Sequence, residues 1–93
     1  MRRIEWTSKF KKDYKREQSG RHRAVVDGEL FTVIEMLAND VILELRYRDH
    51  QLSGNWKSHR DCHIKPDLVL IYEKPNDDVL VLERLGSHSE LGL

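Results

Sequence analysis

Residues 67–85 read DLVLIYEKPNDDVLVLERL, and this stretch decides the fold. From Asp67 to Tyr72 it is almost continuously apolar, which is typical of a central strand covered on at least one face. The turn residues 75–78 follow, and 79–85 are again mostly apolar, so the two segments are predicted to form a β-hairpin. A further strand is expected before them, from about Gly54 to Ile64. The second half of the chain is therefore predicted to be a small antiparallel sheet.

The first half of the chain is predicted to supply one strand and two helices. Alternation over residues 2–6 indicates a strand, and Thr7 or Ser8 is a good cap for a helix that ends at Ser19-Gly20. Residues Arg21 to Asn39 predict a second helix. Its apolar positions form a single stripe, made of Val26, Leu30, Val33, Ile34 and Leu37.

The end of the chain carries the pattern of a capping box, with Ser87 at the cap and Glu90 three residues later. This pattern predicts one helical turn whose first residue is His88. The order β-α-α-β-β-β then indicates an α+β fold: a two-layer sandwich in which a mainly antiparallel sheet carries a helical hairpin on one face.

The composition indicates a single domain spanning residues 1–93, with 39% apolar and 34% charged residues. The single cysteine, Cys62, excludes an intramolecular disulfide and suits a reducing compartment. No apolar run approaches the roughly 18 residues that suggest a membrane span. We therefore expect a cytoplasmic protein without a membrane partner.

The net charge is zero, but the charges are distributed unevenly along the chain. Residues 1–23 hold nine basic and three acidic residues, whereas residues 24–45 hold five acidic residues and no basic one. Local charge sets the field that a polyanion meets, so the basic first helix is a candidate nucleic-acid surface. An ordinary solvated helix face is the alternative interpretation of the same pattern.

Three histidines, His50, His63 and His88, each stand where a turn meets a strand or helix. Alternation along residues 60–64 places Asp61 and His63 on one face of a strand, and Cys62 with Ile64 on the other. If the second helix covers the Cys62 face, the face of Asp61 and His63 is open. Cys62 is then a small apolar residue, and the remaining histidines, His22 and His59, are expected to be solvated and outside the site.

Imidazoles beside cations and carboxylates suit RNA cleavage by the RNA's own 2′-hydroxyl. A base removes the 2′-hydroxyl proton, a cation stabilises the crowded phosphorane and an acid protonates the leaving 5′-oxygen. A metal site built from His50, Asp61, His63 and His88 is the competing interpretation. It is less favoured because the chain has neither a helical His-x-x-x-His pair nor a second cysteine, so we expect no metal and no cofactor.

Three motifs occur in order: YRDHQLSGNW from Tyr47, RDCHIKPDL from Arg60 and ERLGSHSEL from Glu83. In these motifs, and over its whole length, the sequence resembles the YafQ branch of the RelE-like bacterial toxins. The resemblance implies a RelE-like microbial ribonuclease fold. It also implies the toxin half of a type II toxin–antitoxin pair, which cleaves mRNA in the ribosomal decoding site and is silenced by an antitoxin.

The resemblance also implies roles for individual residues. The family's proton-handling group matches His50, His63, Asp67 and His88, with His50 or Asp67 assisting the base step and His88 serving the acid step. Asp61 matches a supporting acid, and Arg84 matches a basic residue near the scissile phosphate. Arg60, Lys65 and Trp56 are not part of that match but are also expected to contact RNA; packing in the core or at the sheet edge is the alternative for Trp56. The sequence departs from the family where an aromatic residue often holds a base, because that position here is Gly92.

The leading hypothesis is therefore a ribosome-dependent, metal-independent mRNA endonuclease. Its expected partners are a cognate antitoxin, mRNA and the ribosome, which the basic helix would contact through ribosomal RNA. Because the terminal aromatic residue is missing, the alternative is a weak or inactive toxin-fold protein that only binds antitoxin or RNA. A metal-dependent hydrolase is a third reading.

Overall fold

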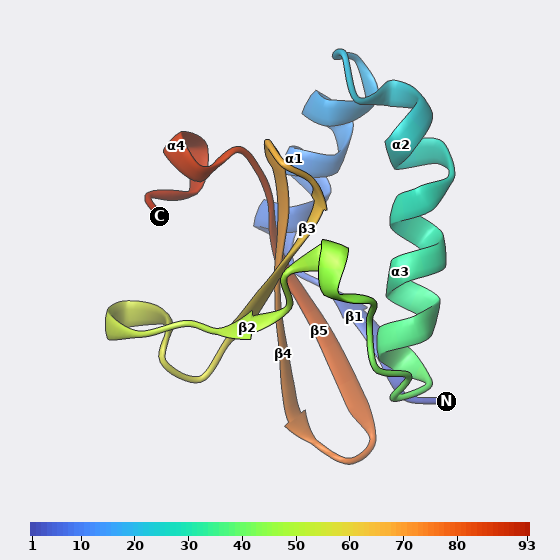
Figure 1. The fold of residues 1–93 in the computed structure, drawn as a ribbon, viewed down its shortest axis with the longest axis vertical. Helices are drawn as coiled ribbons and strands as arrows, with labels where there is room; N and C mark the ends of the chain where they lie inside the picture. The colour runs from blue at the N-terminus through green and yellow to red at the C-terminus, as the bar shows by residue number, and fades with distance from the viewer.

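The computed structural model describes residues 1–93, and its secondary structure follows the expected order with additions (Figure 1). One five-stranded sheet has the order β1-β5-β4-β3-β2, in which only β1 and β5 are parallel. The predicted α+β class is thus confirmed. Along the chain the elements are β1 (Arg3–Trp6), α1 (Ser8–Gln18), α2 (Arg23–Asp27), α3 (Glu29–Ala38), the 3-10 turn η1 (Leu45–Tyr47), β2 (His50–Gln51), the 3-10 turn η2 (Gly54–Trp56), β3 (Arg60–Lys65), β4 (Leu68–Asn76), β5 (Val79–Gly86) and α4 (His88–Leu91).

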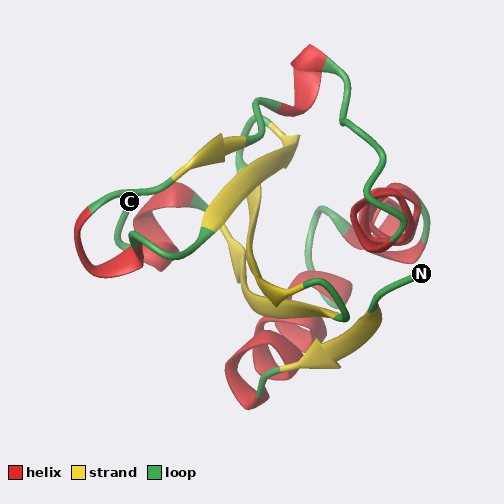
Figure 2. Ribbon diagram, turned by 90° about the horizontal axis from the view of Figure 1, so that it is seen from below, coloured by secondary structure: helices red, strands yellow, loops and turns green.

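The sheet has a helix-covered face and an outer face (Figures 1 and 2). On the helix-covered face, α1, α2 and α3 enclose a core of 17 buried residues, to which β4 contributes Leu68, Leu70 and Tyr72. On the outer face, a second core of only three buried residues joins Val69 and Ile71 of β4 to Leu91 of α4. Because successive residues of β4 alternate between these two cores, the expected central strand is covered on both faces.

The predicted second helix is interrupted at Gly28, which separates α2 from α3. Gly28 has φ −132° and ψ −84°, so the single helix expected over Arg21–Asn39 is wrong in this respect. Glycine weakens a helix because it retains more backbone freedom than any other residue when unfolded. The apolar stripe continues across the break, and all five of its residues are buried: Val26, Leu30, Val33, Ile34 and Leu37.

The predicted strand over Gly54–Ile64 is wrong in its first half. Gly54 has φ +65° and begins the η2 turn, while β3 begins at Arg60. The backbone N–H of Leu52 donates to the carbonyl of His59 at 3.0 Å, which closes a compact loop between β2 and β3. This loop brings the short strand β2, which the sequence pattern did not predict, alongside β3.

A buried carboxylate, Asp13, fastens α1 to β5. The residue is 3% exposed, and its carboxylate accepts from Arg84 Nε at 2.7 Å and from the backbone N–H of Leu85 at 3.0 Å. Arg16 also donates to Asp13, at 3.0 Å, and to the Leu85 carbonyl, at 2.8 Å. These bonds lower the pKa of the Asp13 carboxyl against the opposing effect of burial.

The last turn of the chain, α4, forms as its capping pattern predicted. Ser87 Oγ accepts from the backbone N–H of Glu90 at 3.1 Å, and Glu90 accepts in return from the N–H of Ser87 at 2.9 Å. This reciprocal cap fixes the direction in which the chain leaves β5. None of the helices combines the length and the apolar character that crossing a membrane requires.

Candidate active site on the outer face of the sheet

The three expected imidazoles converge on the outer face. The ring centroids of His63 and His88 are 4.9 Å apart, and those of His50 and His63 are 6.2 Å apart. They arrive from β2, β3 and the first residue of α4. The predicted alternation along β3 is confirmed, because Cys62 and Ile64 belong to the helix-covered core. Burial raises the pKa of the Cys62 thiol, as expected for an inert side chain.

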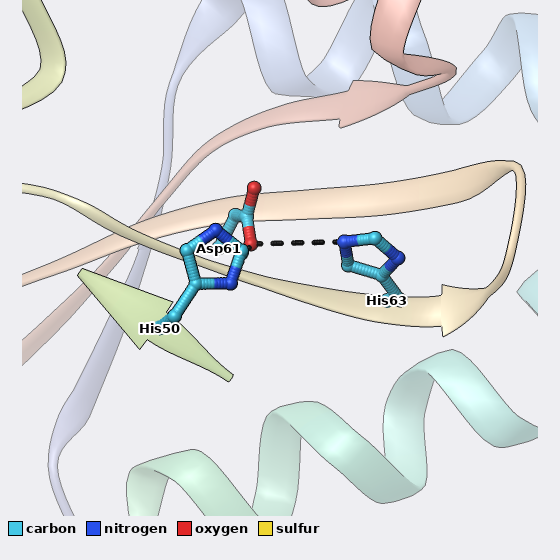
Figure 3. A group of neighbouring side chains, drawn as sticks. All are labelled: His50, Asp61 and His63. Carbon is cyan, nitrogen blue, oxygen red and sulfur yellow. Dashed lines mark ion pairs between the residues drawn. The ribbon is translucent and has the colours of Figure 1, made fainter. Parts of the chain in front are cut away.

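The carboxylate of Asp61 lies beside the rings of His50 and His63 (Figure 3). It is 2% exposed, and its Oδ1 atom lies 3.0 Å from His50 Nδ1 and 3.9 Å from His63 Nε2. Burial raises the pKa of Asp61, while the charges of His50, His63 and His88 act to lower it. Oδ1 has no well-aligned hydrogen-bond partner in the protein, so its stabilisation depends on these neighbouring imidazoles.

The backbone of Arg48 fixes the tautomer of His50. The Nδ1 atom of His50 lies 2.7 Å from the carbonyl oxygen of Arg48. A carbonyl oxygen only accepts hydrogen bonds, so Nδ1 must carry the proton, and in the neutral ring Nε2 keeps a free lone pair. Arg48 adopts a left-handed conformation, with φ +49°, which is unfavourable for a non-glycine residue and places this carbonyl. His50 is thereby held as a proton acceptor whose side chain is half exposed.

His63 lies between the other two imidazoles and is mostly buried, with 12% of its side chain exposed. Burial lowers its pKa. The Asp61 charge opposes this effect, and the charges of His88, His50 and Arg48 reinforce it. His63 therefore favours its neutral form. The capping box of α4 sets the position of His88 beside it.

A pocket of about 630 Å³ opens beside His63 and His88. Three cationic residues line it, Arg46, Arg48 and Lys65. Lys65 Nζ pairs with Glu29 at 3.0 Å, and Arg46 pairs with Glu44 at 3.2 Å. Arg48 is exposed and forms no ion pair, so its guanidinium is the one in this pocket that is free to meet a ligand. Arg48 was not among the residues predicted for the site, although it lies two residues before His50.

Three cations that were predicted to contact RNA are neutralised within the protein. Arg84 is bound to Asp13, Lys65 to Glu29, and Arg60 Nε lies 3.3 Å from Asp49. Each ion pair consumes donors that a phosphate would otherwise use. RNA contacts by these three side chains stay predictions. In this structure, the ion pair that each one forms with a carboxylate would have to break before it could bind a phosphate.

Asp67, the remaining member of the expected proton-handling group, pairs with residues outside the imidazole group. It binds Arg21, and its Oδ1 lies 3.3 Å from His22 Nε2. Its expected part in catalysis stays a prediction. The expectation that His22 and His59 are solvated is wrong, because their side chains are only 13% and 14% exposed. Each packs beside a carboxylate, which sequence spacing alone does not reveal.

A second pocket, of about 410 Å³, adjoins the imidazoles on the side of His50 and His88. Trp56 lines it and also packs against the smaller outer core, so its position is compatible with contact to RNA and with packing against the sheet. Gly92, at φ +71°, and Leu93 also line this pocket. The family's aromatic residue would stand at Gly92, and no aromatic side chain replaces it there.

The site also has the donor set for a divalent ion. Ligand atoms of His50, Asp61 and His63 lie within 4.8 Å of one another. Imidazole nitrogens with one carboxylate oxygen suit zinc and neighbouring transition metals. The same three groups therefore fit both acid–base chemistry and metal binding, and geometry alone does not choose between them.

Comparison with known proteins gives one consistent result. Residues 2–92 match the family described as "Bacterial toxin of type II toxin-antitoxin system, YafQ". The mRNA interferase toxin YafQ of Escherichia coli K12 is 40% identical over 89 residues, which cover 95% of this chain and 92% of that protein.

Two solved structures show the same fold. The E. coli DinJ-YafQ complex has a TM-score of 0.81 at 35% identity and covers 98% of both chains. A metal-bound toxin from Helicobacter pylori has a TM-score of 0.80 at 41% identity, covering 98% of this chain and 99% of that one.

Proposed function

This chain belongs to the YafQ family of bacterial type II toxins, and from that premise we propose that it is an mRNA interferase acting in the cytoplasm on ribosome-bound mRNA. The observation that carries the proposal is the convergence of His50, His63 and His88 over one buried carboxylate. Cleavage proceeds by attack of the 2′-hydroxyl oxygen on the adjacent phosphorus.

The base step belongs to His50. Its Nδ1 proton is held by the Arg48 carbonyl and faces Asp61, so Nε2 accepts the 2′-hydroxyl proton and the new charge is stabilised by the carboxylate. Like the carboxylate of a catalytic triad, Asp61 stabilises the protonated imidazole, but here the Arg48 carbonyl and not the carboxylate orients the ring. His63 is a positioning residue between His50 and His88, kept neutral by burial.

The acid step belongs to His88. It lines both pockets and donates a proton to the leaving 5′-oxygen. Arg48 supplies the positive charge for the phosphorane, since it lines the pocket shared by His63 and His88 and has no carboxylate partner. The products are then a 2′,3′-cyclic phosphate and a free 5′-hydroxyl.

The ribosome is contacted through α1. Four of its lysines are exposed and form no ion pair within the protein: Lys9, Lys11, Lys12 and Lys15. Such a stripe suits the phosphates of ribosomal RNA. The antitoxin partner follows from the relatives, because E. coli YafQ forms a complex with DinJ. We propose that a cognate antitoxin binds and silences this chain in the same way.

The reaction requires no metal, because imidazoles supply both proton transfers. A divalent ion held by His50, Asp61 and His63 would supply Lewis acidity, and the residues present would fit it. Chelation distinguishes the two cases. Undiminished cleavage in excess EDTA supports the acid–base reaction, whereas loss of cleavage that a divalent ion restores would favour a metal-dependent hydrolase.

The test of the proposal is cleavage of a defined mRNA on translating ribosomes, followed by primer extension. The parent protein should cut mRNA on ribosomes and leave the same RNA uncut when ribosomes are omitted. Equal cutting of free RNA would contradict ribosome dependence. Failure to cut in either condition would contradict the enzymatic function.

A binding module without activity is the second candidate, and the absence of an aromatic side chain at Gly92 favours it. Induction of the gene without its antitoxin separates the two. Growth arrest that disappears in His88→Gln at equal protein level supports the enzyme. Normal growth of cells that make the parent protein would support the binding module.

A further inference from the structure

A second cluster of ligand side chains lies on the outer face, away from the imidazoles described above. It consists of His59, which immediately precedes β3, Glu73 on β4 and Glu83 on β5. Their ligand atoms all lie within 4.8 Å of one another. We propose that these three residues form a binding site for a divalent transition-metal ion of the zinc class, which no part of the toxin reaction uses.

The histidine ring is arranged as a ligand. His59 Nδ1 lies 3.1 Å from Ser58 Oγ, and the backbone N–H of His59 donates to the Trp56 carbonyl at 2.8 Å. These contacts fix the ring and direct Nε2 toward the two glutamates. Nε2 is buried and has no hydrogen-bond partner in the protein. Metal-binding histidines commonly have one ring nitrogen held by a second group in this way, while the other faces the ion.

The carboxylates of Glu73 and Glu83 have no cationic neighbour within ion-pair distance other than His59. His59 Nε2 lies 3.3 Å from Glu83 Oε1 and 4.0 Å from Glu73 Oε1, and neither glutamate forms an ion pair with lysine or arginine. Both are about three-quarters buried, so bringing them together without a counter-charge is unfavourable. A dication between them removes this repulsion. A protonated His59 supplies only one positive charge.

The distances suit a tetrahedral ion. Bonds of about 2.0–2.1 Å to nitrogen and oxygen place two tetrahedral ligand atoms roughly 3.3 Å apart. That is the separation of His59 Nε2 and Glu83 Oε1. Glu73 Oε1 lies 4.0 Å from His59 Nε2, so this side chain would have to move closer to bind the same ion, and water would supply the fourth ligand. One imidazole nitrogen favours zinc-class ions over magnesium, which prefers oxygen ligands.

The backbone also supports this arrangement. Glu83 occupies an irregularity between β4 and β5, where Ile71 pairs with Arg84 and Tyr72 with Leu82. The carbonyl of Glu83 accepts from Thr7 Oγ1 at 2.9 Å, which anchors this residue to the start of α1. A bound ion would therefore link β4, β5 and the β2–β3 loop that carries Trp56.

The experiment is isothermal titration of the full chain with Zn²⁺, using Glu83→Gln, Glu73→Gln and the matched surface control Glu35→Gln. The catalytic group can also bind metal, so Asp61→Asn is titrated in parallel to identify that contribution. We expect Glu83→Gln and Glu73→Gln each to lose one equivalent of Zn²⁺ that Glu35→Gln and Asp61→Asn retain. Ser58→Ala should weaken the same equivalent by about 10-fold, because it releases the ring.

Thermal unfolding gives the second measurement. Zn²⁺ should raise the Tm of Glu35→Gln and Asp61→Asn through this site, and this part of the shift should be absent in Glu83→Gln. Cleavage of mRNA on ribosomes by metal-free Glu83→Gln should equal that of the parent protein. The test of the metal site is therefore independent of the test of the proposed enzymatic function. Equal Zn²⁺ stoichiometry and affinity in the parent protein and Glu83→Gln would contradict the proposed site. Binding of Mg²⁺ to the parent protein as tightly as Zn²⁺ would also contradict it.

Discussion

The two faces of the sheet differ in what fills them. The helix-covered face buries 17 residues in one apolar cluster, whereas the outer face buries three and leaves room for three imidazoles and a carboxylate. Apolar burial supplies most of the free energy of folding, so stability is concentrated on the first face. The outer face can therefore hold a partly exposed polar group whose own burial is unfavourable. The candidate active site and the main apolar core therefore lie on opposite faces of the same sheet.

The largest effect that tests this separation is expected from His88→Gln. Loss of a proton donor reduces cleavage by roughly 10²–10⁴-fold, whereas the Tm should stay near that of the parent because His88 belongs to neither apolar core. Cleavage on ribosomes and thermal unfolding measure the two properties. Cys62→Ala, on the opposite face of β3, is the matched control and should retain cleavage. Parent-like cleavage by His88→Gln would remove His88 from the acid step.

Asp13→Ala is expected to show the reverse pattern. Removing this buried carboxylate leaves Arg84 without its partner and should lower the free energy of unfolding by about 3–5 kcal/mol. Urea denaturation measures this change, and the nearby exposed Lys12→Ala serves as control. Because the pKa of Asp13 is lowered in the folded state, its stabilising contribution is present above the unfolded pKa. It is lost as the pH falls through the folded value. An unchanged unfolding midpoint would contradict the role of Asp13.

A smaller effect is expected from Arg48→Gln. The loss of one charge-assisted contact with phosphate should reduce cleavage by about 10-fold, which corresponds to roughly 1.4 kcal/mol. Stability should be unaffected, because the Arg48 side chain has no ion pair, while its backbone carbonyl still holds His50. Arg84→Gln is the informative comparison, since it should destabilise the protein through Asp13. If Arg84→Gln reduces cleavage at full stability and Arg48→Gln does not, the phosphate contact belongs to Arg84.

The smallest effect concerns the pKa of His63, measured by NMR titration of its ring proton. Burial lowers this pKa below the ordinary value of 6.5, and Asp61 counteracts the shift. Asp61→Asn should therefore lower the pKa of His63 further. In the parent protein, the lowered pKa means that the contribution of His63 to the free energy of unfolding is present above pH 6.5. This contribution is lost as the pH falls through the folded pKa of His63. A rise of the pKa in Asp61→Asn would show that the carboxylate acts differently.

Local patterns predicted most of the fold but only part of the site. The apolar stripe of the second helix, the β4–β5 hairpin and the capping box of α4 depend on neighbouring residues, and all three are confirmed. Alternation along β3 likewise placed Asp61 and His63 on the outer face. The interruption at Gly28 was missed because an isolated glycine is often tolerated inside a helical pattern, and the η2 turn was missed although Ser53-Gly54 is a turn signal.

Long-range pairing could not be predicted in the same way. Asp13 and Arg84 are 71 residues apart, and Lys65 and Glu29 are brought together only by the fold. A cation is available to a substrate only when no carboxylate of its own protein is nearby, and the sequence does not show that. For this reason Arg84, Arg60 and Lys65 were predicted to contact RNA, whereas in the structure the cation without a carboxylate partner beside the imidazoles is Arg48.

The chemical ends of the cut mRNA test the central claim most directly. The parent protein is incubated with programmed ribosomes in excess EDTA, and the upstream fragment is analysed for its 3′ end. Attack by the 2′-hydroxyl predicts a 2′,3′-cyclic phosphate, or the 3′-phosphate formed from it, with a 5′-hydroxyl on the downstream fragment. A 3′-hydroxyl paired with a 5′-phosphate would show that water is the nucleophile, and would contradict catalysis by the imidazoles of the outer face.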